Sequence, residues 1–592
     1  MSTRATPITC DVLVAGSGAG GLAAAVTARF HKLDVLLVEK APVFGGTTAW
    51  SGGWLWIPGN AHARNAGTTD TIAAARTYLQ AELGESFDGK KVEAFLAHGP
   101  AMVDFFERET ALQFFPGLAT PDFHAHSPGA GVGRPVCALP FDGRALGGLI
   151  AKLRPPLAEI TVLGMAIAAG ADLRHMMNAT RRPASTWHAA KRFGRHALDV
   201  ARHRRGMHLA NGNALVARLL ESASALGVRM WTDAPVRALD VVDGKVVGAR
   251  VQMAEGVVRV EARRGVVLAC GGFPHDVERR RTLFPLAPTG REHWSAAPPE
   301  NTGDGLRLAE AAAAAIVKTL HPAAWAPVSE VRHRDGRVGY FPHLVDRAKP
   351  GVIAVDVDGA RFVNEAGSYH DFIAALQAVT PPGRVPAAWL VADHRTLRRY
   401  GLGFAKPFPF PVAPYLKMGY LLRGDTPEAL ARACGIDPAG FAATLALYNA
   451  AARSGDDPAF GRGSTPFNRF GGDPDHAPNP CVAPVEHAPF YAVKLLPGSL
   501  GTFAGVRTDA NAQALTRDGA PIPGLYAVGN DMASVMGGRY PGGGITLGPA
   551  MTFGYLAARH IAGVRESIDA SPGGATRVSP PSFNDRTQVT RA

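Results

Sequence analysis

The chain has 592 residues, of which 46% are hydrophobic and only 19% charged, and 62 Lys and Arg against 50 Asp and Glu give a net charge of +12. This composition excludes global disorder, because disordered chains are poor in apolar residues and rich in charge. The five cysteines are scattered without Cys-x-x-Cys spacing, so we expect neither a disulfide framework nor a metal site. No apolar signal core or membrane-length apolar stretch is present, and the modest positive charge comes without a nucleic-acid motif. We therefore predict a cytoplasmic protein without a nucleic-acid partner.

The first elements in the chain have the order of a dinucleotide-binding unit. Residues 12–15 form a continuous apolar run typical of a buried parallel strand, and residues 22–30 favour a helix. Residues 35–38 form a second buried strand, and Glu39 follows it at the position that accepts a hydrogen bond from a ribose hydroxyl. Because strand, helix, strand and acid occur in order, a chance glycine turn is the weaker explanation.

Glycines occupy the positions of this unit at which the backbone must approach a ligand. Gly16 permits a tight turn, Gly18 lets backbone N–H groups reach a pyrophosphate, and Gly21 allows close helix packing. The next segment, residues 44–53, is too glycine-rich for a helix interior or a strand, so its amides are free to face a ligand. A plain surface loop would not ordinarily carry its cluster of tryptophans, so we interpret it as part of a flavin site.

The middle of the first half adds further strands and a second candidate ligand-facing helix. Residues 227–231 and 245–251 predict strands of a second, small sheet, and residues 266–269 predict another buried strand. The segment 301–305 precedes an alanine-rich helix predicted at 306–315. The amides at the start of that helix can meet a phosphate or a flavin.

From about residue 353 the pattern changes to alternating strands and proline-rich loops, which predicts an inserted α+β substrate domain. The last part of the chain again has the pattern of the first domain: a buried strand at 525–528, a glycine loop at 540–544 and a helix at 548–560. The N-terminus of that helix can stabilise negative charge on a flavin. We predict a Rossmann-like α/β fold with a parallel sheet and a small antiparallel sheet. The expected division is an FAD-binding domain at 1–328 and 502–565, a substrate and catalytic domain at 329–501, and a flexible tail at 566–592.

A basic helical insertion is expected at 150–210. Between Arg174 and Arg205, nine Lys or Arg accompany a single acid, Asp199. One interpretation is a solvated helical face. The other is a peripheral contact with anionic lipid headgroups, which would suit a substrate that partitions into membranes.

These motifs together resemble the 3-ketosteroid Δ1-dehydrogenases, within the fumarate reductase and succinate dehydrogenase flavoprotein superfamily. The resemblance rests on the glycine motif with Glu39, on residues 44–53, on Asn364 and Glu365 with Tyr369, on residues 524–530 and on the tyrosine-bearing loop 540–549. It covers about residues 11–562 and weakens around 150–210. It implies an FAD-dependent oxidoreductase of steroid degradation with a lipophilic ketone substrate and an unidentified electron acceptor. No histidine lies at 45–53, so we expect noncovalent FAD.

The family removes two hydrogens from ring A of a 3-keto steroid: a tyrosine takes the proton at C2, and the hydride at C1 goes to flavin N5. The resemblance gives the first role to Tyr369, and gives the hydrogen bonds to the C3 ketone to Tyr540 and the Gly544 amide. The family's third tyrosine, which supports the base, corresponds to Phe123, whose ring cannot donate. Either the site tolerates this loss, or the activity differs, or a histidine supplies the polar partner, with His124, His126 and His370 as candidates.

The motifs and the resemblance also predict a set of cofactor-binding residues. They are loop and helix-start positions that place backbone groups or small side chains against FAD. The set consists of Gly16, Gly18, Ala19, Gly20, Gly21, Glu39, Lys40, Gly45, Gly46, Thr47, Thr48, Ser51, Gly52, Gly53, Val236, Ala269, Gly271, Asn301, Gly303, Asp304, Gly529, Asn530, Gly544, Thr546 and Leu547.

Three other functions stay open at this point. A fumarate-like reductase would need an arginine proton donor and cationic clamps on a carboxylate, and Arg539 lies beside Tyr540. A related enzyme could desaturate a cyclic ketone that is not a steroid. A flavin fold kept for binding, without catalysis, would show no bleaching of the flavin by any substrate.

Overall fold

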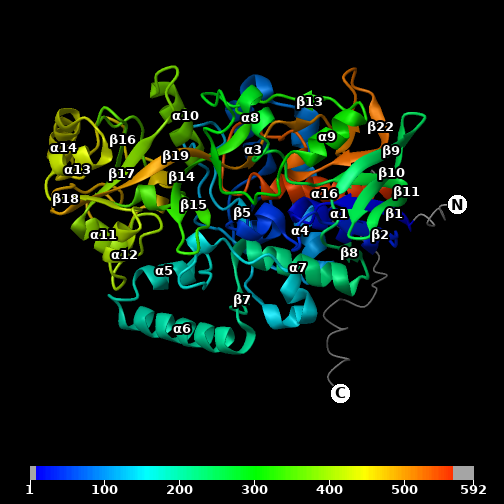
Figure 1. Ribbon diagram of the computed structural model, residues 1–592, viewed down its shortest axis with the longest axis horizontal. Coiled ribbons are helices and arrows are strands. Elements are labelled where there is room, and N and C mark those ends of the chain that lie inside the picture. Colours follow the sequence, from blue (N-terminus) through cyan, green and yellow to red (C-terminus); the bar gives the residue numbers. More distant parts are fainter. Residues whose placement is uncertain (1–7, 565–592) are drawn as a thin grey trace.

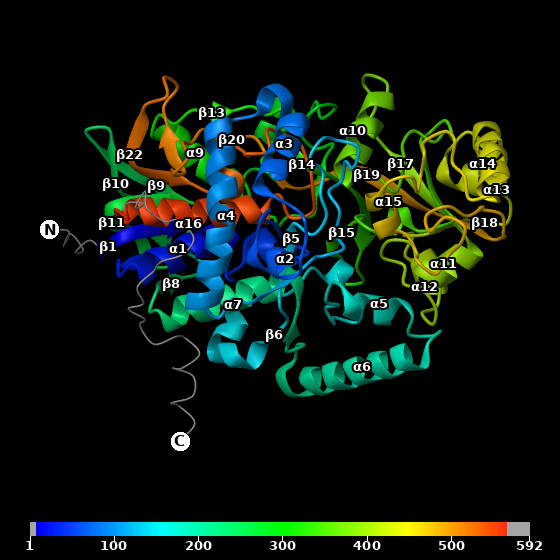
Figure 2. The same cartoon turned by 180° about the vertical axis from the view of Figure 1, so that it is seen from behind.

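The computed structural model describes residues 8–564, so the tail predicted at 566–592 lies outside the described residues. Two sheet-centred bodies lie side by side (Figure 1), and both termini of the described chain belong to the right-hand body. The view from behind shows helices α1, α4, α7 and α16 against the first sheet (Figure 2). The fold is the predicted α/β class with a parallel sheet and antiparallel sheets.

The first sheet has eight strands, in the order β21-β22-β11-β1-β2-β8, with β10 and β9 added at β11. The pairs from β22 through β11, β1 and β2 to β8 are parallel, and β9, β10 and β11 pair antiparallel. The strands are β1 (Ile8–Ala15), β2 (Val35–Val38), β8 (Arg229–Trp231), β9 (Val236–Val242), β10 (Lys245–Met253), β11 (Gly256–Leu268), β21 (Gln513–Leu515) and β22 (Pro521–Ala527).

Helices cover this sheet because their apolar faces need a partner. The buried, alanine-rich face of α1 packs against α16 and α7, and α16 also packs against α4. The helices of this half are α1 (Ala19–Phe30), α2 (Ala61–Asn65), α3 (Ile72–Leu83), α4 (Gly89–Glu109), α7 (Asn211–Ala225), α8 (Val277–Leu283), α9 (Asp304–Ala311) and α16 (Leu547–Ile561). Short strands β3 (Trp54–Trp56), β4 (Phe114–Pro116) and β5 (Pro135–Ala138) form a separate small sheet.

One strand assignment was wrong. We expected residues 227–231 to belong with 245–251 in a small sheet, but β8 pairs with β2 at the edge of the parallel sheet. The partner of β10 is β9, and the two join at an Asp-Gly turn in which Asp243 and Gly244 both have positive φ. β9 escaped prediction because its side chains are only partly buried, so its sequence lacks a continuous apolar run. The long strand β11 joins both regions into one sheet.

The second sheet has the order β15-β14-β19-β17-β16, with β12 and β18 also paired to β19. The 13-residue strand β19 is its centre, and α10 packs on β14. The strands are β12 (Trp294–Ser295), β14 (Ala323–Arg332), β15 (Val338–Pro342), β16 (Val352–Val355), β17 (Ala388–Asp393), β18 (Leu422–Gly424) and β19 (Phe490–Thr502). The helices are α10 (Tyr369–Val379), α11 (His394–Tyr400), α12 (Ala413–Lys417), α13 (Pro427–Cys434), α14 (Pro438–Ala452) and α15 (Pro466–Gly471). The division at 328 and 501 stays a prediction; these positions lie in β14 and β19.

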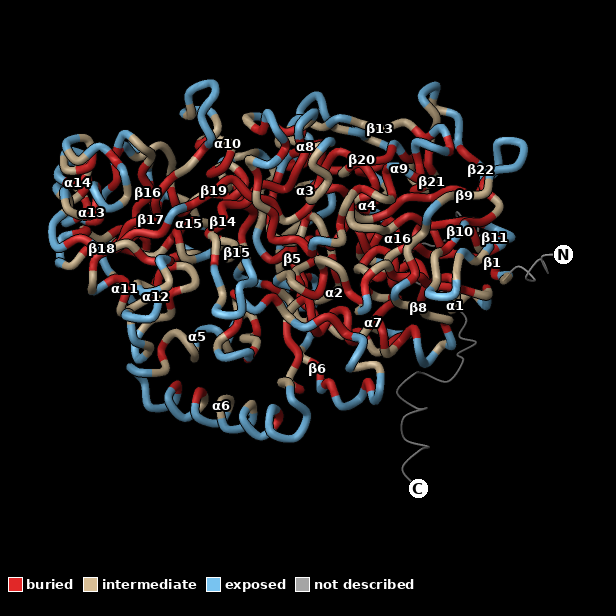
Figure 3. Tube along the Cα trace, in the orientation of Figure 1, coloured by how far each residue is buried: buried red, intermediate tan, exposed pale blue. Residues whose placement is uncertain are grey.

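The predicted basic insertion forms a separate arm below the two bodies. It contains α5 (Ala171–Met177) and the 21-residue helix α6 (Pro183–His203), which lies at the lower edge in Figure 1. Figure 3 shows most of α6 as exposed, with a few buried positions facing the protein. A two-residue ladder between β6 (Phe141–Asp142) and β7 (His208–Leu209) brings the ends of the arm together. Among residues 8–564, no helix has the length and apolar composition to span a membrane.

Candidate active site

A cavity of about 1180 Å³ extends between the two bodies and is lined by residues of both. Its wall includes the glycine turn after β1, the start of α16, and Tyr369 at the beginning of α10. Single-ligand pockets typically measure ~300–1,000 Å³. The cavity therefore has room for a cofactor and a second ligand.

The turn between β1 and α1 has a backbone that only glycine allows. Gly16 has a φ of +111°, and a Cβ at this position would lie 2.1 Å from the carbonyl oxygen of Ala269 at the end of β11. A Cβ on Gly21 would lie 2.0 Å from the carbonyl oxygen of Gly16. The two glycines let helix α1 start directly above the carboxyl ends of β1 and β11, which is the edge of a parallel sheet where dinucleotides bind.

Three helices begin in or beside the cavity without a side-chain cap. The N-cap residues are Gly18 for α1, Gly303 for α9 and Thr546 for α16, and none of them accepts a hydrogen bond from the helix through its side chain. The first N–H groups of a helix have no intrahelical acceptor and attract negative charge. These features fit FAD, whose pyrophosphate and reduced ring are both anionic.

Glu39 ends β2 in a fixed orientation. Its Oε2 accepts hydrogen bonds from the Ser17 amide (3.0 Å) and the Ser17 hydroxyl (2.5 Å), and its Oε1 accepts from the Ala41 amide (3.0 Å). Carboxylate oxygens have several lone pairs, so Glu39 keeps acceptor capacity for a ribose hydroxyl. Lys40 is more fully engaged, because its ammonium donates to Asp304 Oδ2 (2.7 Å) and Thr302 Oγ1 (2.7 Å) and thereby ties the start of α9 to β2.

An aromatic cluster lies in the part of the cavity formed by both bodies. The ring centroids of Tyr369 and Tyr540 are 4.9 Å apart and edge-to-face. Phe123 lies 5.3 Å from Tyr369, and it stacks on Tyr540 at 5.6 Å and contacts Phe467 at 4.2 Å. The cluster holds two phenol rings almost out of water, with 8% exposure for Tyr369 and 3% for Tyr540.

Burial determines the protonation of these two tyrosines. It raises the pKa of Tyr369 well above the ordinary value, and the adjacent Tyr540 raises it further, while Arg347 acts in the opposite direction. Burial also raises the pKa of Tyr540 to about 12, although hydrogen bonding with Tyr369 and Thr546 lowers it in part. Both hydroxyls are therefore protonated at neutral pH and can donate.

Gly544 places a free amide beside Tyr540. Its φ is +101°, and a Cβ would lie 2.7 Å from the Trp54 carbonyl oxygen, so the position requires glycine. Its carbonyl oxygen accepts from the amides of Trp56 (3.1 Å) and Gly548 (2.9 Å). Within residues 8–564 its own N–H has no acceptor, and the residue lines the cavity. The Gly544 N–H and Tyr540 thus line the same cavity as candidate donors to a ligand.

None of the three candidate histidines donates to Tyr369 in the described structure. His126 is exposed. The ring of His370 lies 5.8 Å from that of Tyr540 and is uncharged, because burial lowers its pKa to about 3. Its Nδ1 accepts from the Trp325 amide (3.1 Å), whereas Nε2 has no partner among the described residues.

His124 has a different role: it joins the two bodies. Its Nδ1 lies 2.5 Å from Glu82 Oε2 on α3, and its Nε2 lies 2.7 Å from Asp371 Oδ2 in the first turn of α10. Burial disfavours the charged imidazolium, but the hydrogen bonds to Asp371 and Glu82 outweigh it and raise the pKa of His124 to about 10. The imidazolium thus fixes the start of the helix that carries Tyr369.

The cavity brings together most residues predicted from the sequence. All four predicted catalytic residues line it, as do all predicted cofactor residues except Gly45 and Gly303. The Gly45 amide donates to Ser17 Oγ (2.9 Å). Gly303 is the N-cap of α9 and directly precedes Asp304, which does line the cavity. Their contact with FAD stays a prediction, as do the individual roles of the others.

Arg154, Arg347 and Arg399 line the wall and had escaped prediction. Arg154 lines the cavity beside Trp50 and pairs with Glu300 (3.1 Å), and Arg347 donates to the carbonyl oxygens of Glu365 (2.7 Å) and His343 (2.8 Å). Arg347 is the cation that lowers the pKa of Tyr369. None of the three belongs to a sequence motif, because their roles arise from contacts between distant segments.

Known proteins that resemble this chain in sequence and in structure are flavoproteins and dehydrogenases, as the site's fit to FAD suggests. Residues 11–547 match the family model described as FAD binding domain. The chain is 43% identical to a 4-oxocyclohex-2-ene-1-carboxylate 5-dehydrogenase of Sinomonas cyclohexanicum, over 94% of each chain. It is 38% identical to a 3-oxosteroid 1-dehydrogenase of Mycobacterium tuberculosis, over 93% of this chain and 98% of that protein. The crystal structure of a 3-ketosteroid Δ1-dehydrogenase from Sterolibacterium denitrificans with 1,4-androstadiene-3,17-dione superposes with a TM-score of 0.86, at 36% identity, over 94% of this chain and all of that one.

We expect Gly16→Ala to yield protein with little bound flavin. The new Cβ meets the Ala269 carbonyl and demands a strained φ, so the turn must move away from the cofactor position. The ratio of flavin to protein absorbance in the purified protein measures the effect. Gly148→Ala, at a position with open space around the Cβ, is the control and should keep the wild-type ratio. A wild-type ratio in Gly16→Ala would contradict the assignment of this turn.

We expect His124→Gln to lower the melting temperature in a pH-dependent way. The folded-state pKa of about 10 lies above the ordinary 6.5, so the ion pairs stabilise fully below about pH 6.5 and lose effect as pH rises towards 10. The gap in melting temperature between wild type and variant should therefore shrink from pH 6.5 to pH 10. His126→Gln, at an exposed site, should show no gap. A gap that is constant with pH would show that His124 is not charged in the folded protein.

Proposed function

The chain belongs to the FAD binding domain family of flavoproteins, and on this premise we propose that it introduces a C1=C2 double bond into ring A of a 3-ketosteroid. Similarity over almost the whole chain to dehydrogenases identifies it as an FAD-dependent oxidoreductase acting on CH–CH groups. The observation that carries the finer proposal is the grouping of Tyr369, Tyr540 and the free Gly544 amide in one cavity wall.

The Tyr540 hydroxyl and the Gly544 amide form the ketone-binding pair. Both are donors; Tyr540 is 3% exposed and Gly544 is half-buried. Donors aimed at an oxygen that gains negative charge during reaction stabilise the transition state by roughly 3–4 kcal/mol each in such a site. Polarising the ketone in this way acidifies the neighbouring carbon.

Tyr369 is the proton acceptor. Its raised pKa means that the hydroxyl is protonated in the free protein. Proton transfer to Tyr369 therefore requires a phenolate to form first, and burial disfavours that charged form. Arg347 favours the phenolate by its positive charge. The resemblance implies that Phe123 stands where the family has a supporting tyrosine, and its ring cannot donate a hydrogen bond. When bound, FAD supplies a hydride acceptor for the hydrogen on the adjacent carbon.

The extent of the apolar wall supports a steroid-sized substrate. Beyond the aromatic cluster, the cavity is lined by aliphatic and aromatic side chains of the arm, among them Leu157, Ile160, Ile167, Met177 and Phe193. A single cyclohexane ring would leave most of this wall uncovered. The second candidate, a non-steroid cyclic ketone, is favoured by the relative at 43% identity, whose name gives an oxocyclohexene carboxylate as substrate.

Arg539 does not supply the proton donor that the reductase alternative requires. Its side chain is exposed and does not line the cavity, although it neighbours Tyr540 in sequence. A proton donor must reach the substrate within hydrogen-bonding distance. Arg539 does not meet this condition in the described structure.

Anaerobic mixing of the purified flavoprotein with three compounds tests the proposal. We expect 4-androstene-3,17-dione to bleach the flavin rapidly. Faster bleaching by 4-oxocyclohexanecarboxylate would shift the assignment to the smaller ketone. Reoxidation of the dithionite-reduced protein by fumarate, without bleaching by either ketone, would contradict the proposal.

We expect Tyr369→Phe to slow flavin reduction by about 10²–10⁴-fold and Tyr540→Phe by about 10²–10³-fold, because each loses one hydroxyl from the reaction. Both variants should keep bound FAD. Tyr340→Phe, outside the cavity wall, is the control. Wild-type rates in either cavity variant would remove that tyrosine from the mechanism.

We also propose that the outer face of α6 contacts an anionic membrane surface. Trp187 is 74% exposed and Leu198 57% exposed, and they lie on the same face as the exposed Lys191, Arg195 and Arg202. Other basic residues of the arm are neutralised within the protein, such as Arg192 by Asp172 (3.2 Å). An exposed tryptophan among lysines and arginines is typical of interfacial helices.

We expect the protein to sediment with vesicles that contain phosphatidylserine at low salt and to be released at about 0.5 M NaCl, because salt screens headgroup attraction. Trp187→Ser combined with Lys191→Glu should abolish sedimentation. Lys245→Glu, a surface change on β10, should leave it unaltered. Absence of salt-sensitive binding in the wild type would leave α6 as a solvated helix.

A further inference from the structure

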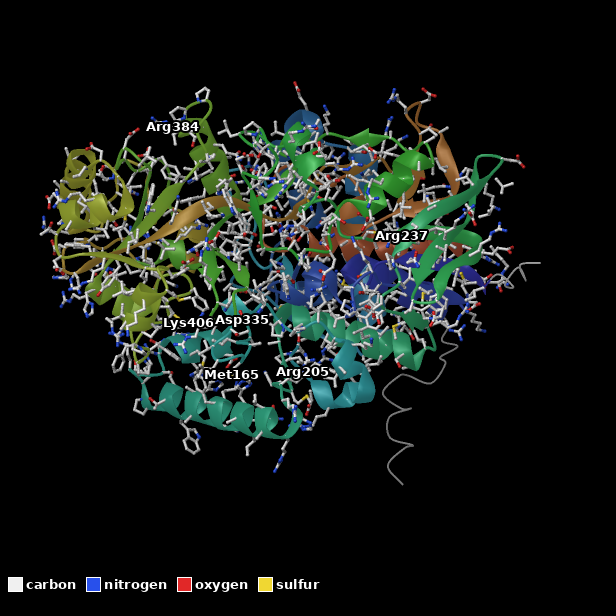
Figure 4. All side chains as sticks on the ribbon, viewed as in Figure 1. Met165, Arg205, Arg237, Asp335, Arg384 and Lys406 are labelled. Atoms are coloured by element: carbon white, nitrogen blue, oxygen red, sulfur yellow. The ribbon has the colours of Figure 1, made fainter. Side chains whose placement is uncertain are left out.

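Lys406 is a cation in the cavity wall with spare hydrogen-bond donors. It lies between α11 and α12, and Figure 4 labels it on the lower side of the substrate body. Its ammonium donates to the carbonyl oxygen of Glu159 over 3.3 Å, the sole hydrogen bond that it makes among residues 8–564. An ammonium carries three N–H groups, so two remain available.

Among residues 8–564, no carboxylate lies within ion-pair distance of the Lys406 ammonium. Two aromatic rings lie near, with centroids 5.6 Å (Phe341) and 5.4 Å (Phe404) from Nζ. The two neighbouring carboxylates contact histidines, Glu159 Oε1 with His333 (2.6 Å) and Asp346 Oδ2 with His343 (2.7 Å). Both carboxylates favour the charged form of Lys406 from a distance, and Asp346 Oδ1 has no hydrogen-bond partner among the described residues. In the described part of the chain neither carboxylate forms an ion pair with Lys406, and burial lowers the pKa of Lys406 to about 8.

The other cations of the wall differ from Lys406 because they are exposed or already engaged. Arg174 is exposed, and Lys349 donates to the carbonyl oxygens of Gly471 (2.8 Å) and Gly472 (2.7 Å). Arg399 donates to the Met177 carbonyl (2.9 Å) and Asp473 (3.1 Å). Lys40 and Arg347 are held by several hydrogen bonds, whereas Arg154 donates to Glu300 through one nitrogen and its Nε has no partner among the described residues. Lys406 thus keeps two donors for a ligand in the second body; Arg154 also keeps unused donors, but it lies over Trp50 in the glycine-rich segment 44–53.

We propose that Lys406 donates a hydrogen bond to an oxygen that the substrate carries at the end remote from its reacting ketone. The inference rests on the proposed function, because Lys406 and the Tyr369–Tyr540 pair line one cavity. The two groups contact different residues: the tyrosines touch Phe123 and each other, whereas Lys406 touches Glu159 and two other rings. A substrate that reaches both must carry a second acceptor oxygen.

The chemistry of this subsite defines a substrate class. An ammonium only donates, so the remote group is an acceptor: a carbonyl, a hydroxyl oxygen or a carboxylate. A substrate with only hydrocarbon at that end would bury the ammonium without a partner, and sites with buried polar groups reject such analogues strongly. The enzyme should therefore prefer doubly oxygenated ketones over otherwise identical mono-ketones.

A substrate pair crossed with variants tests the inference. 4-Androstene-3,17-dione carries a ring D oxygen, and 4-androsten-3-one lacks it. We expect Lys406→Met to raise KM for the dione by about tenfold or more, which is the effect of losing one charge-assisted hydrogen bond, without changing kcat. KM for the mono-ketone should stay unchanged. Lys406→Gln, which keeps a neutral donor, should give an intermediate KM for the dione, and Lys417→Met, an exposed lysine on α12, should behave as wild type.

The outcomes separate the two proposals. An equal change of KM for both steroids in Lys406→Met and Lys406→Gln would overturn the role of Lys406 and leave the proposed function standing. If the wild type accepts only 4-oxocyclohexanecarboxylate, the same variants are compared on this acid and on 4-methylcyclohexanone, with the same expected difference. If no ketone bleaches the flavin of the wild type, the proposed function and the role of Lys406 both fail.

Discussion

The active site depends on one ionic contact across the two bodies of the molecule. Tyr369 begins a helix of the second body, whereas Tyr540 and Gly544 belong to the loop before α16 in the first. The imidazolium of His124 lies between Glu82 and Asp371 and thus joins α3 to the first turn of α10. The imidazolium is partly buried and has a carboxylate on each side, so two charge-assisted hydrogen bonds hold α3 and α10 together.

The same end of the cavity shows how the loop at 540–544 is kept in place. The Pro541 carbonyl accepts from the Tyr78 hydroxyl (2.7 Å) and from the Phe123 amide (2.9 Å). Beneath it, Asp122 accepts from the Trp56 indole (2.8 Å) and pairs with the buried Arg134. The loop at 540–544 therefore rests on a polar network whose members come from four segments far apart in the sequence.

Local patterns predicted those features that local physics determines. Strand β2 has the predicted limits, and the glycine positions before α1 were apparent because a tight turn between a buried strand and a helix needs them. β9 was missed because a half-exposed strand has no continuous apolar run. The charged state of His124 and the roles of Arg347 and Lys406 had no sequence signal. These properties result from burial and from partners that other segments contribute. Arg347, for example, donates to the carbonyl oxygen of Gly367, 20 positions along the chain.

The ladder that closes the arm has a consequence for how this scaffold diversifies. Phe141 pairs with Leu209 and Asp142 with His208, so the chain leaves and re-enters the first body at neighbouring points. Closure entropy grows only slowly with the length of a loop, so a segment attached in this way can lengthen, shorten or be exchanged at little cost to the core. The arm forms much of the apolar cavity wall, while the tyrosines and the cofactor turn lie outside it. On the proposed function, substrate range and reaction chemistry lie in separable parts of the chain. A graft between relatives at residues 142 and 208 would then exchange the apolar wall while retaining the tyrosines and the cofactor turn.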